Sequence, residues 1–321
     1  MAQITAPAPT RAYQLIGYSF AALGTTLFAI KGILIKLAYG DAGGAPAVDA
    51  ITLLALRMMF SLPVYIVIGA MAWRNHVRSG NEKIPLDVLI VSIAVGIIGY
   101  YLSAYLDFVG LLYLSVQLER LILYTYPMFV MVLGAIFFGY SVTMRGVLAL
   151  LIAYAGIGVI FGGGATASGE HTLYGAAFVM TGAITFAGYQ LVAASVVRRM
   201  GPWLFTCVAM MTASAATLIH FSIVHSPGDL FTQTPRIYWL VAVMAVFATI
   251  MPTFMINAAL GRINAQAVAT IGTISPVATI IMAVVIIGEP FTFIDALGTA
   301  LVLIGVGLFT LADARRKRGA G

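Results

Sequence analysis

The sequence predicts an all-α, polytopic membrane protein whose ten transmembrane helices form two inverted five-helix repeats. Three observations lead to this fold class: the composition, ten apolar runs of membrane-spanning length, and an internal repeat. Of the 321 residues, 61% are hydrophobic and only 9% are charged, whereas about 25% are charged in an ordinary soluble domain. The mean hydropathy is +1.02. This composition excludes a soluble globular protein and a disordered chain, and the single cysteine, Cys207, excludes a disulfide scaffold.

Ten apolar runs are each long enough to cross a bilayer, which takes about 20 helical residues. Helices satisfy their own backbone hydrogen bonds in lipid, and the alternating ten-residue segments of a transmembrane barrel are missing from the sequence. We interpret the first run as a span and not as a signal peptide, because it continues past Lys31 to Leu37. The runs lie near residues 13–38, 49–72, 86–112, 115–138, 144–162, 172–197, 203–224, 236–258, 264–287 and 293–312.

The basic residues predict how the chain is oriented. If the amino terminus is cytoplasmic, twelve of the 17 Lys and Arg residues fall on cytoplasmic segments, and Arg236 alone falls on the opposite side. We therefore expect a protein of the cytoplasmic (inner) membrane with both termini in the cytoplasm. Residues 1–12 form the amino-terminal tail and residues 313–321 form a basic tail. The basic tail is interpreted as an orientation signal, and binding to anionic lipid is the alternative.

An internal repeat divides the chain into two halves. A shift of 149 residues aligns 117–159 with 266–308 without a gap. The identical pairs are Gln117/Gln266, Ile122/Ile271, Pro127/Pro276, Gly139/Gly288, Thr143/Thr292, Leu148/Leu297, Gly156/Gly305 and Gly158/Gly307. The predicted repeats cover 13–163 and 172–312. Because five spans is an odd number, the second repeat enters the membrane from the opposite side, which is typical of secondary transporters with a binding site near the midplane.

Several short motifs carry a family resemblance. The run Ile287-Gly288-Glu289-Pro290, before a glycine-rich last span, resembles the end of EamA-type members of the drug/metabolite transporter superfamily. Pro276 within the preceding span fits the same pattern. The first half has Pro127 and Gly139-Tyr140, with Tyr140 where the family often has Glu, and Leu54-Ala55-Leu56-Arg57 in the second span is also similar to the family. The resemblance covers nearly the whole chain and implies a carrier of small metabolites without naming the substrate.

Ionisable residues within the spans are candidates for the binding site, because each costs about 2.5–3.5 kcal/mol to insert into a membrane. Lys31, Lys36, Arg57, Glu119 and Arg120 lie at a similar predicted depth, so we expect the outer half of the first repeat to hold four cations and one anion. Three interpretations stay open. Glu119 pairs with one cation while the others reach toward water, as we expect for Lys36; or the cations bind a substrate carboxylate; or Glu119 carries a proton.

Further polar and aromatic residues complete the candidate site. Tyr101 and Tyr105 share one helix face. The amides of Gln190, Asn257 and Gln266 are costly to bury without partners, so we expect them at a central cavity. The full set of substrate-site candidates is Lys31, Arg57, Tyr101, Tyr105, Glu119, Arg120, Tyr124, Tyr189, Gln190, Asn257, Gln266 and Thr270.

Two prolines within spans are candidates for moving bends. Pro127 and Pro276 each remove a backbone hydrogen bond from a helix, and we expect each to let its half open one side. A static kink is the alternative at both positions.

Together these features predict a secondary transporter that moves a small organic metabolite, such as an amino acid or a related compound, by alternating access, in export or exchange. The alternatives are a passive channel and, less favoured, a membrane-embedded enzyme, since the sequence has no HExxH, Walker or G-x-S-x-G motif. We expect no cofactor and no metal. The expected partners are the substrate and the lipid bilayer and not nucleic acid, and a homodimer is left open.

Overall fold

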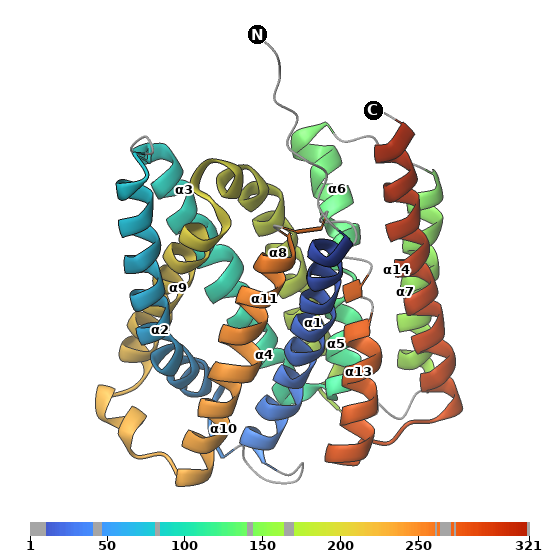
Figure 1. Ribbon diagram of the computed structural model, residues 1–321. Helices are drawn as coiled ribbons and strands as arrows, with labels where there is room; N and C mark the ends of the chain where they lie inside the picture. Colours follow the sequence, from blue (N-terminus) through green and yellow to red (C-terminus); the bar gives the residue numbers. More distant parts are fainter. Residues whose placement is uncertain are drawn as a thin grey trace.

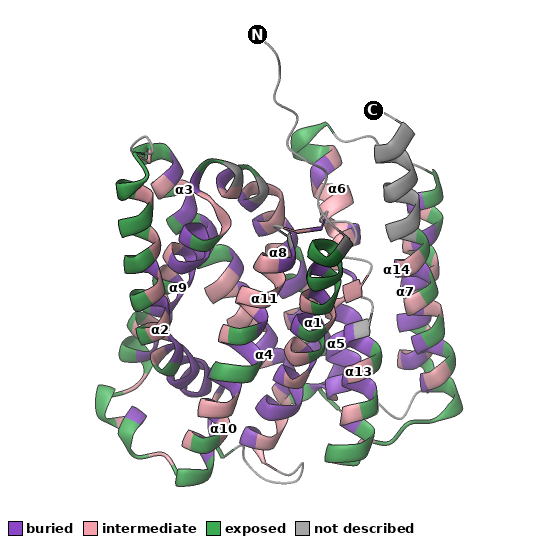
Figure 2. Ribbon diagram, in the orientation of Figure 1, coloured by how far each residue is buried: buried purple, intermediate pink, exposed green. Residues whose placement is uncertain are grey.

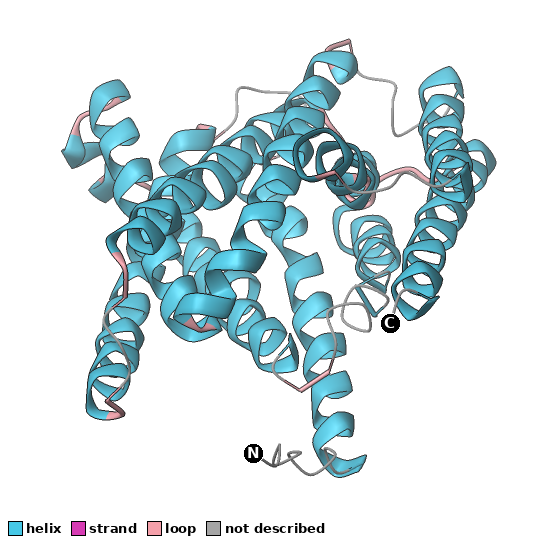
Figure 3. Ribbon diagram, turned by 90° about the horizontal axis from the view of Figure 1, so that it is seen from above, coloured by secondary structure: helices cyan, strands magenta, loops and turns pink. Residues whose placement is uncertain are grey.

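The described part of the chain is helical. A computed structural model describes residues 11–40, 47–80, 84–139, 144–163, 170–260, 262–263, 271–272 and 274–319. Within these ranges there is no strand, and Figure 3 shows helices joined by short loops. Eight helices of this part are long and apolar enough to span a membrane. They are Ala12–Tyr39, Ala50–Arg78, Leu86–Tyr113, Val116–Phe138, Met144–Gly163, Thr172–Val197, Pro202–Val224 and Pro235–Ile256. The predicted all-α class is confirmed for the described residues.

The last two predicted spans are represented by shorter helices. The described residues contain the apolar helical stretches Ser275–Ile287 and Phe293–Leu308, each of 10–17 residues; the second is the first part of a longer helix that continues to Gly319. Much of the amino-terminal part of the predicted span 264–287 lies outside the described residues. The total of ten transmembrane helices therefore stays a prediction.

Six of the long segments are single helices. They are α1 (Arg11–Tyr39), α2 (Ala50–Arg78), α7 (Met144–Gly163), α8 (Thr172–Met200), α9 (Pro202–Val224) and α14 (Phe293–Gly319). Asp49 begins α2 by accepting the backbone N–H groups of Ile51 and Thr52, both at 3.1 Å. A short 3₁₀ helix, η3 (Pro227–Phe231), follows α9.

The remaining segments are interrupted. The first consists of α3 (Leu86–Gly96), the π-helical turn η1 (Ile97–Leu102) and α4 (Ser103–Tyr113). The second consists of α10 (Pro235–Ala245), the π-helical turn η4 (Val246–Ile250) and α11 (Met251–Leu260). The third consists of α13 (Ile274–Met282) and the π-helical turn η5 (Ala283–Ile287). The fourth predicted span is broken into α5 (Val116–Leu123) and α6 (Tyr126–Phe138). The first two π-helical turns begin 149 residues apart, at Ile97 and Val246, which is the spacing of the sequence repeat.

Helices of the two halves pack in reciprocal pairs. The strongest pairings are α7 with α14, α2 with α9, α4 with α8 and α1 with α11, and α7 and α14 lie side by side in Figure 1. A Cβ atom added to Gly156 would lie 2.5 Å from the carbonyl oxygen of Gly298, and one added to Gly305 would lie 2.6 Å from the backbone nitrogen of Ala153. These contacts make α7 and α14 antiparallel and require glycine at both positions, whereas a Cβ at Gly158 would meet nothing within 4 Å.

The surface and the chain ends suit a membrane. Figure 2 shows buried residues where helices face one another and many exposed residues on the outside of the bundle. Large apolar side chains are strongly exposed there, with Phe293 at 82% and Ile223 at 78%; a soluble protein rarely exposes so much apolar surface. The start of α1 and the end of α14 lie at the same end of the bundle (Figure 1).

Candidate functional site

Five charged side chains from four helices meet inside the first half of the chain. They are Lys31 on α1, Arg57 on α2, Asp107 on α4, and Glu119 and Arg120 on α5, and each residue is at most 5% exposed. We call these five residues the central charge cluster. Burying this many charges is costly unless they face one another, so their convergence marks the region of the fold where polarity is concentrated.

Lys31 and Asp107 form the tightest contact in the cluster. The Lys31 Nζ donates to Asp107 Oδ2 at 2.6 Å, and the two side chains are 7% and 2% exposed. The ammonium also lies 5.4 Å from the centre of the Phe28 ring. The sequence-based count of one anion among the charged residues of the first repeat is wrong, because it left out Asp107 within the third span. The cluster therefore holds three cations and two carboxylates.

Glu119 is poorly paired for a buried carboxylate. Its nearest ion-pair partner is the neighbouring Arg120, with Nε to Oε2 at 3.8 Å. The carboxyl group of Glu119 faces that of Asp107, and neither of its oxygens has a hydrogen-bond donor. The buried Nε and Nη2 of Arg120 have no hydrogen-bond partner. Gly32 on α1 lets this part of α5 approach closely, since a Cβ there would lie 2.8 Å from Val116 Cγ1. Buried polar groups without partners are costly, and they are characteristic of sites that receive a ligand or change their contacts.

Arg57 faces Asp107 and an aromatic ring. Its guanidinium carbon lies 5.0 Å from the centre of the Phe108 ring, and Asp107 is the carboxylate that interacts with it electrostatically. The Nε atom of Arg57 is buried and has no hydrogen-bond partner. The cluster thus presents unpartnered donors on Arg57 and Arg120 next to the facing carboxyl groups of Asp107 and Glu119.

Lys36 lies apart from this cluster. Its Nζ donates to the backbone carbonyls of Leu111 at 3.1 Å and Leu114 at 2.8 Å. The expectation that Lys36 reaches toward water is therefore corrected: its ammonium binds the carbonyl groups at the end of α4, where a helix C-terminus attracts cations.

Tyr101 and Tyr105 lie on one face, as their spacing predicts, with stacked rings whose centres are 6.4 Å apart. Both rings pack edge-on against His220 of α9, and the Tyr101 hydroxyl is 2.8 Å from His220 Nδ1. Sequence reasoning missed His220, because it lies on a different helix and belongs to no motif.

Tyr189 and Gln190 belong to an aromatic region on α8. The Tyr189 hydroxyl donates to the Tyr100 hydroxyl at 2.9 Å, and its ring stacks on Phe186 at 5.3 Å. Gln190 lies beside Tyr126. These contacts place two of the candidates in side-chain packing between α8 and the third and fourth predicted spans.

The remaining candidates for the site and for the bends lie at the break between α5 and α6, in α13, or at positions that are not described. Tyr124 lies in the break between α5 and α6, with Pro127 in the first turn of α6, and Pro276 is the third residue of α13. The side chain of Asn257 is not described, and Gln266 and Thr270 lie outside the described residues.

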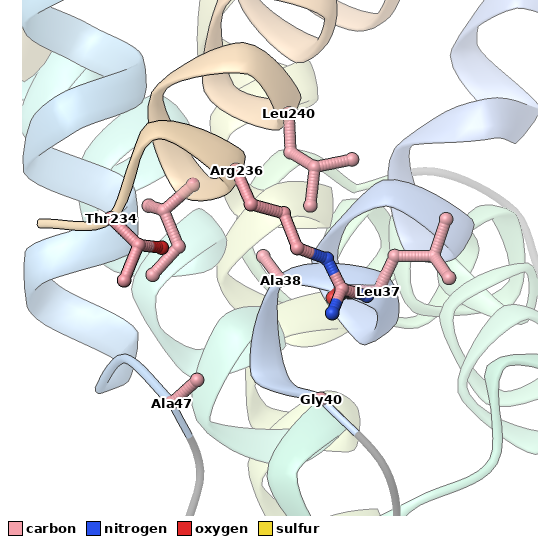
Figure 4. Close-up of a pocket in the computed structure, with 8 residues that line it drawn as sticks. Leu37, Ala38, Gly40, Ala47, Thr234, Arg236 and Leu240 are labelled. Carbon is pink, nitrogen blue, oxygen red and sulfur yellow. Dashed lines mark hydrogen bonds between the residues drawn. The ribbon is translucent and has the colours of Figure 1, made fainter.

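A separate pocket of about 390 Å³ opens between the end of α1 and the start of α10 (Figure 4). The guanidinium of Arg236 reaches across it, and Nη2 donates to the backbone carbonyl of Leu37 at 3.3 Å. No candidate site residue lines this pocket. Among the described residues, no group of three His, Cys, Asp or Glu side chains is arranged to hold a metal ion.

An apolar helical bundle with a buried cluster of charges defines a polytopic membrane protein with a polar interior. Comparison with known protein families then identifies the family within this class. The model of the EamA-like transporter family matches residues 15–162 and 173–311, so the chain belongs to that family. The resemblance found in the sequence is confirmed.

Relatives and solved structures agree with this membership. The chain is 29% identical over 288 residues to the uncharacterized transporter YcbK of Bacillus subtilis, covering 88% of each chain. It is 23% identical to the uncharacterized transporter sll1319 of Synechocystis, covering 92% of this chain and 93% of the relative. A solved crystal structure of another protein matches with a TM-score of 0.59 and 17% identity over 94% of this chain and 99% of that chain, which shows a shared fold. The chain is therefore a multi-pass membrane protein of a transporter family.

Proposed function

We propose that the protein is a secondary transporter that moves a small organic metabolite across the cytoplasmic membrane by alternating access. In this proposal, residues 13–163 and 172–312 form two five-helix repeats of opposite orientation, and both termini lie in the cytoplasm. The observation that carries the proposal is the reciprocal packing of the two halves, because alternating access needs two similar halves that can exchange their contacts at opposite ends.

The packing supports inversion in detail. In the proposed repeat, α7 and α14 are equivalent, and their contacts run antiparallel. The equivalent helices α2 and α9 also run antiparallel: Asp49 before α2 lies 3.4 Å from His225 after α9, and Gly69 late in α2 packs against Cys207 early in α9. The family model also matches the chain twice, once over each proposed half. A passive channel requires neither feature.

The substrate site that we propose is built around the central charge cluster. Its buried guanidinium groups on Arg57 and Arg120 have unpartnered donors, beside the facing carboxyl groups of Asp107 and Glu119. With three basic side chains against two carboxyl groups, the cluster has at least one positive charge in excess, which favours a substrate that carries a carboxylate, such as an amino acid. Tyr101, Tyr105, Tyr124, Tyr189, Gln190, Asn257, Gln266 and Thr270 remain proposed contributors to the transport path.

Counterflow in proteoliposomes tests the transport mechanism. A thermal-shift screen of the purified protein against amino acids, amines, nucleosides and sugar phosphates identifies a ligand first. Vesicles are then loaded with unlabelled ligand, and uptake of a labelled trace is followed. A carrier takes up the labelled compound faster when the same compound is inside. Equal uptake into loaded and empty vesicles would contradict alternating access and favour a channel.

A further inference from the structure

Glu289 joins the two halves of the chain at a helix terminus. It follows η5 in the loop before α14, and its carboxylate accepts the backbone N–H of Val116 at 2.7 Å and that of Gln117 at 3.3 Å. The side-chain amide of Gln117 donates in turn to the carbonyl of Pro290 at 3.3 Å. A loop of the second half therefore holds the first turn of α5, which belongs to the first half.

This contact has a clear physical basis. The first N–H groups of a helix have no partner within the helix, and the helix dipole attracts negative charge to them. Ser115 satisfies the N–H of Leu118 at 3.2 Å, and Glu289 satisfies the two before it. Gly288 has φ +75°, a conformation that favours glycine, and this turn directs Glu289 toward α5. The pair Gly288-Glu289 thus combines a turn with a capping carboxylate.

A cation holds the other side of the same turn. The ammonium of Lys36, on α1, binds the carbonyls of Leu111 and Leu114 at the end of α4, and it attracts Glu289 electrostatically. Leu114 is 1% exposed. The turn between α4 and α5 is therefore clamped between Lys36 and Glu289, each bound to the helix terminus that its charge favours.

The helix held by this clamp is a short, separate element. α5 has eight residues, and the turn at Tyr124 and Thr125 separates it from α6. Glu119 and Arg120 lie three and four residues after Val116, so about 4.5–6 Å along the helix from the clamp. A displacement of the start of α5 would therefore move two members of the central charge cluster.

We propose that Lys36 and Glu289 form a latch that closes the transport path at the end of the bundle opposite to the start of α1 (Figure 1). Release of the latch frees α5, together with Glu119 and Arg120, from the second half. This proposal rests on the alternating-access mechanism proposed above. The position that aligns with Glu289 in the first half is Tyr140, which has no carboxylate, so the gate at the other end must be held by different contacts. The two gates therefore differ in their dependence on charge.

Cysteine labelling in nanodiscs tests the latch. In a Cys207→Ser background, the reporter Val116→Cys replaces a side chain that is 0% exposed. Its rate of reaction with a polar maleimide reports release of the latch. We expect Glu289→Gln and Lys36→Met each to raise this rate about tenfold, the effect of losing roughly one charge-assisted hydrogen bond. Glu170→Gln, which removes an exposed carboxylate next to the start of α8, is the matched control and should leave the rate unchanged.

A second reporter separates opening of one end from general loosening. The reporter Ala21→Cys lies in the first half of α1, at the eleventh of its 29 residues, and replaces a residue that is 0% exposed and packs in one cluster with Ala259 and Ile263. The latch predicts that Glu289→Gln leaves the labelling of this reporter unchanged or lowers it. Equal increases at both reporters, or no increase at Val116→Cys in either latch variant, would overturn the proposal.

The use of two different variants separates loss of the latch from misfolding. Glu289→Gln keeps an amide oxygen that can accept one hydrogen bond, and Lys36→Met leaves Glu289 in place. Labelling needs no substrate, so its outcome is independent of counterflow. If the latch variants label as expected but the protein shows no counterflow, the transport mechanism alone is overturned. If counterflow is normal but labelling in the latch variants is unchanged, the latch alone is overturned.

Discussion

The pair formed by Lys31 and Asp107 provides the sharpest energetic prediction. Both side chains are buried and their charged atoms lie 2.6 Å apart. Removing one partner of a buried ion pair typically costs about 3–5 kcal/mol, because the other charge stays buried without compensation. Replacing both partners by apolar residues of similar size is often neutral or stabilising. The variants Lys31→Met, Asp107→Leu and their combination therefore form a double-mutant cycle.

The two single variants should differ, because the cluster contains other charges. Asp107→Leu leaves Lys31, Arg57 and Arg120 against Glu119 alone, so at least two positive charges are uncompensated. Lys31→Met leaves two cations against two carboxylates, and Asp107 keeps its attraction to Arg57. We therefore expect Asp107→Leu to be the more destabilising single variant.

The assay is thermal unfolding of purified protein in detergent. At about 2 °C per kcal/mol for a chain of this size, Asp107→Leu should lower the unfolding temperature by about 6–10 °C, Lys31→Met by less, and the double variant should recover most of the loss. The exposed pair of Arg199 and Asp87, 2.9 Å apart with side chains 53% and 64% exposed, is the control, and Asp87→Leu should change little. A double variant as unstable as Asp107→Leu, or two harmless single variants, would refute the reasoning.

Three further predictions concern packing, the site and the helix break. Gly156→Ala should lower the unfolding temperature by about 2–6 °C, since overpacking costs about 1–3 kcal/mol, whereas Gly158→Ala, which points into open space, should not; equal effects would contradict the close packing of α7 and α14. The double variant Glu119→Gln with Arg120→Gln should fold but lose the thermal shift caused by carboxylate ligands while keeping that of neutral ones; an unchanged carboxylate shift would exclude the cluster as the recognition site. Pro127→Ala should slow counterflow more than it lowers folded yield if the break between α5 and α6 moves, and parallel losses would indicate a static kink.

Much of the fold could be predicted from the sequence, because bilayer thickness constrains apolar runs so strongly. The predicted runs 49–72 and 203–224 correspond to α2 and α9. The glycines of the repeat could be noted but not explained: Gly156 and Gly305 allow α7 and α14 to touch, while Gly158 and Gly307 face open space. That difference depends on which helix faces meet, and one sequence does not determine the pairing of helices.

The candidate site was predicted in part. The depth argument placed Lys31, Arg57, Glu119 and Arg120 at one level, and in the structure they share one buried cluster with Asp107; its role as the substrate site stays a prediction. The same argument applies to Asp107, a lone carboxylate within a span, and applying it consistently would have found the partner of Lys31. Glu289 is different, because it lies outside the spans and binds a helix 172 residues earlier in the chain. Its role follows only from tertiary packing.

The orientation of the two halves is the central claim, and paired reporter fusions test it most directly. Two reporters are each fused after Gly163 and after Gly321 in bacterial cells. Alkaline phosphatase is active only outside the cytoplasm. Green fluorescent protein becomes fluorescent in the cytoplasm and stays dark when it is exported unfolded. Inverted halves predict phosphatase activity after Gly163 and fluorescence after Gly321. The same reporter active at both positions would mean that residues 172–312 begin and end on one side, and it would contradict the inverted repeat and the mechanism built on it.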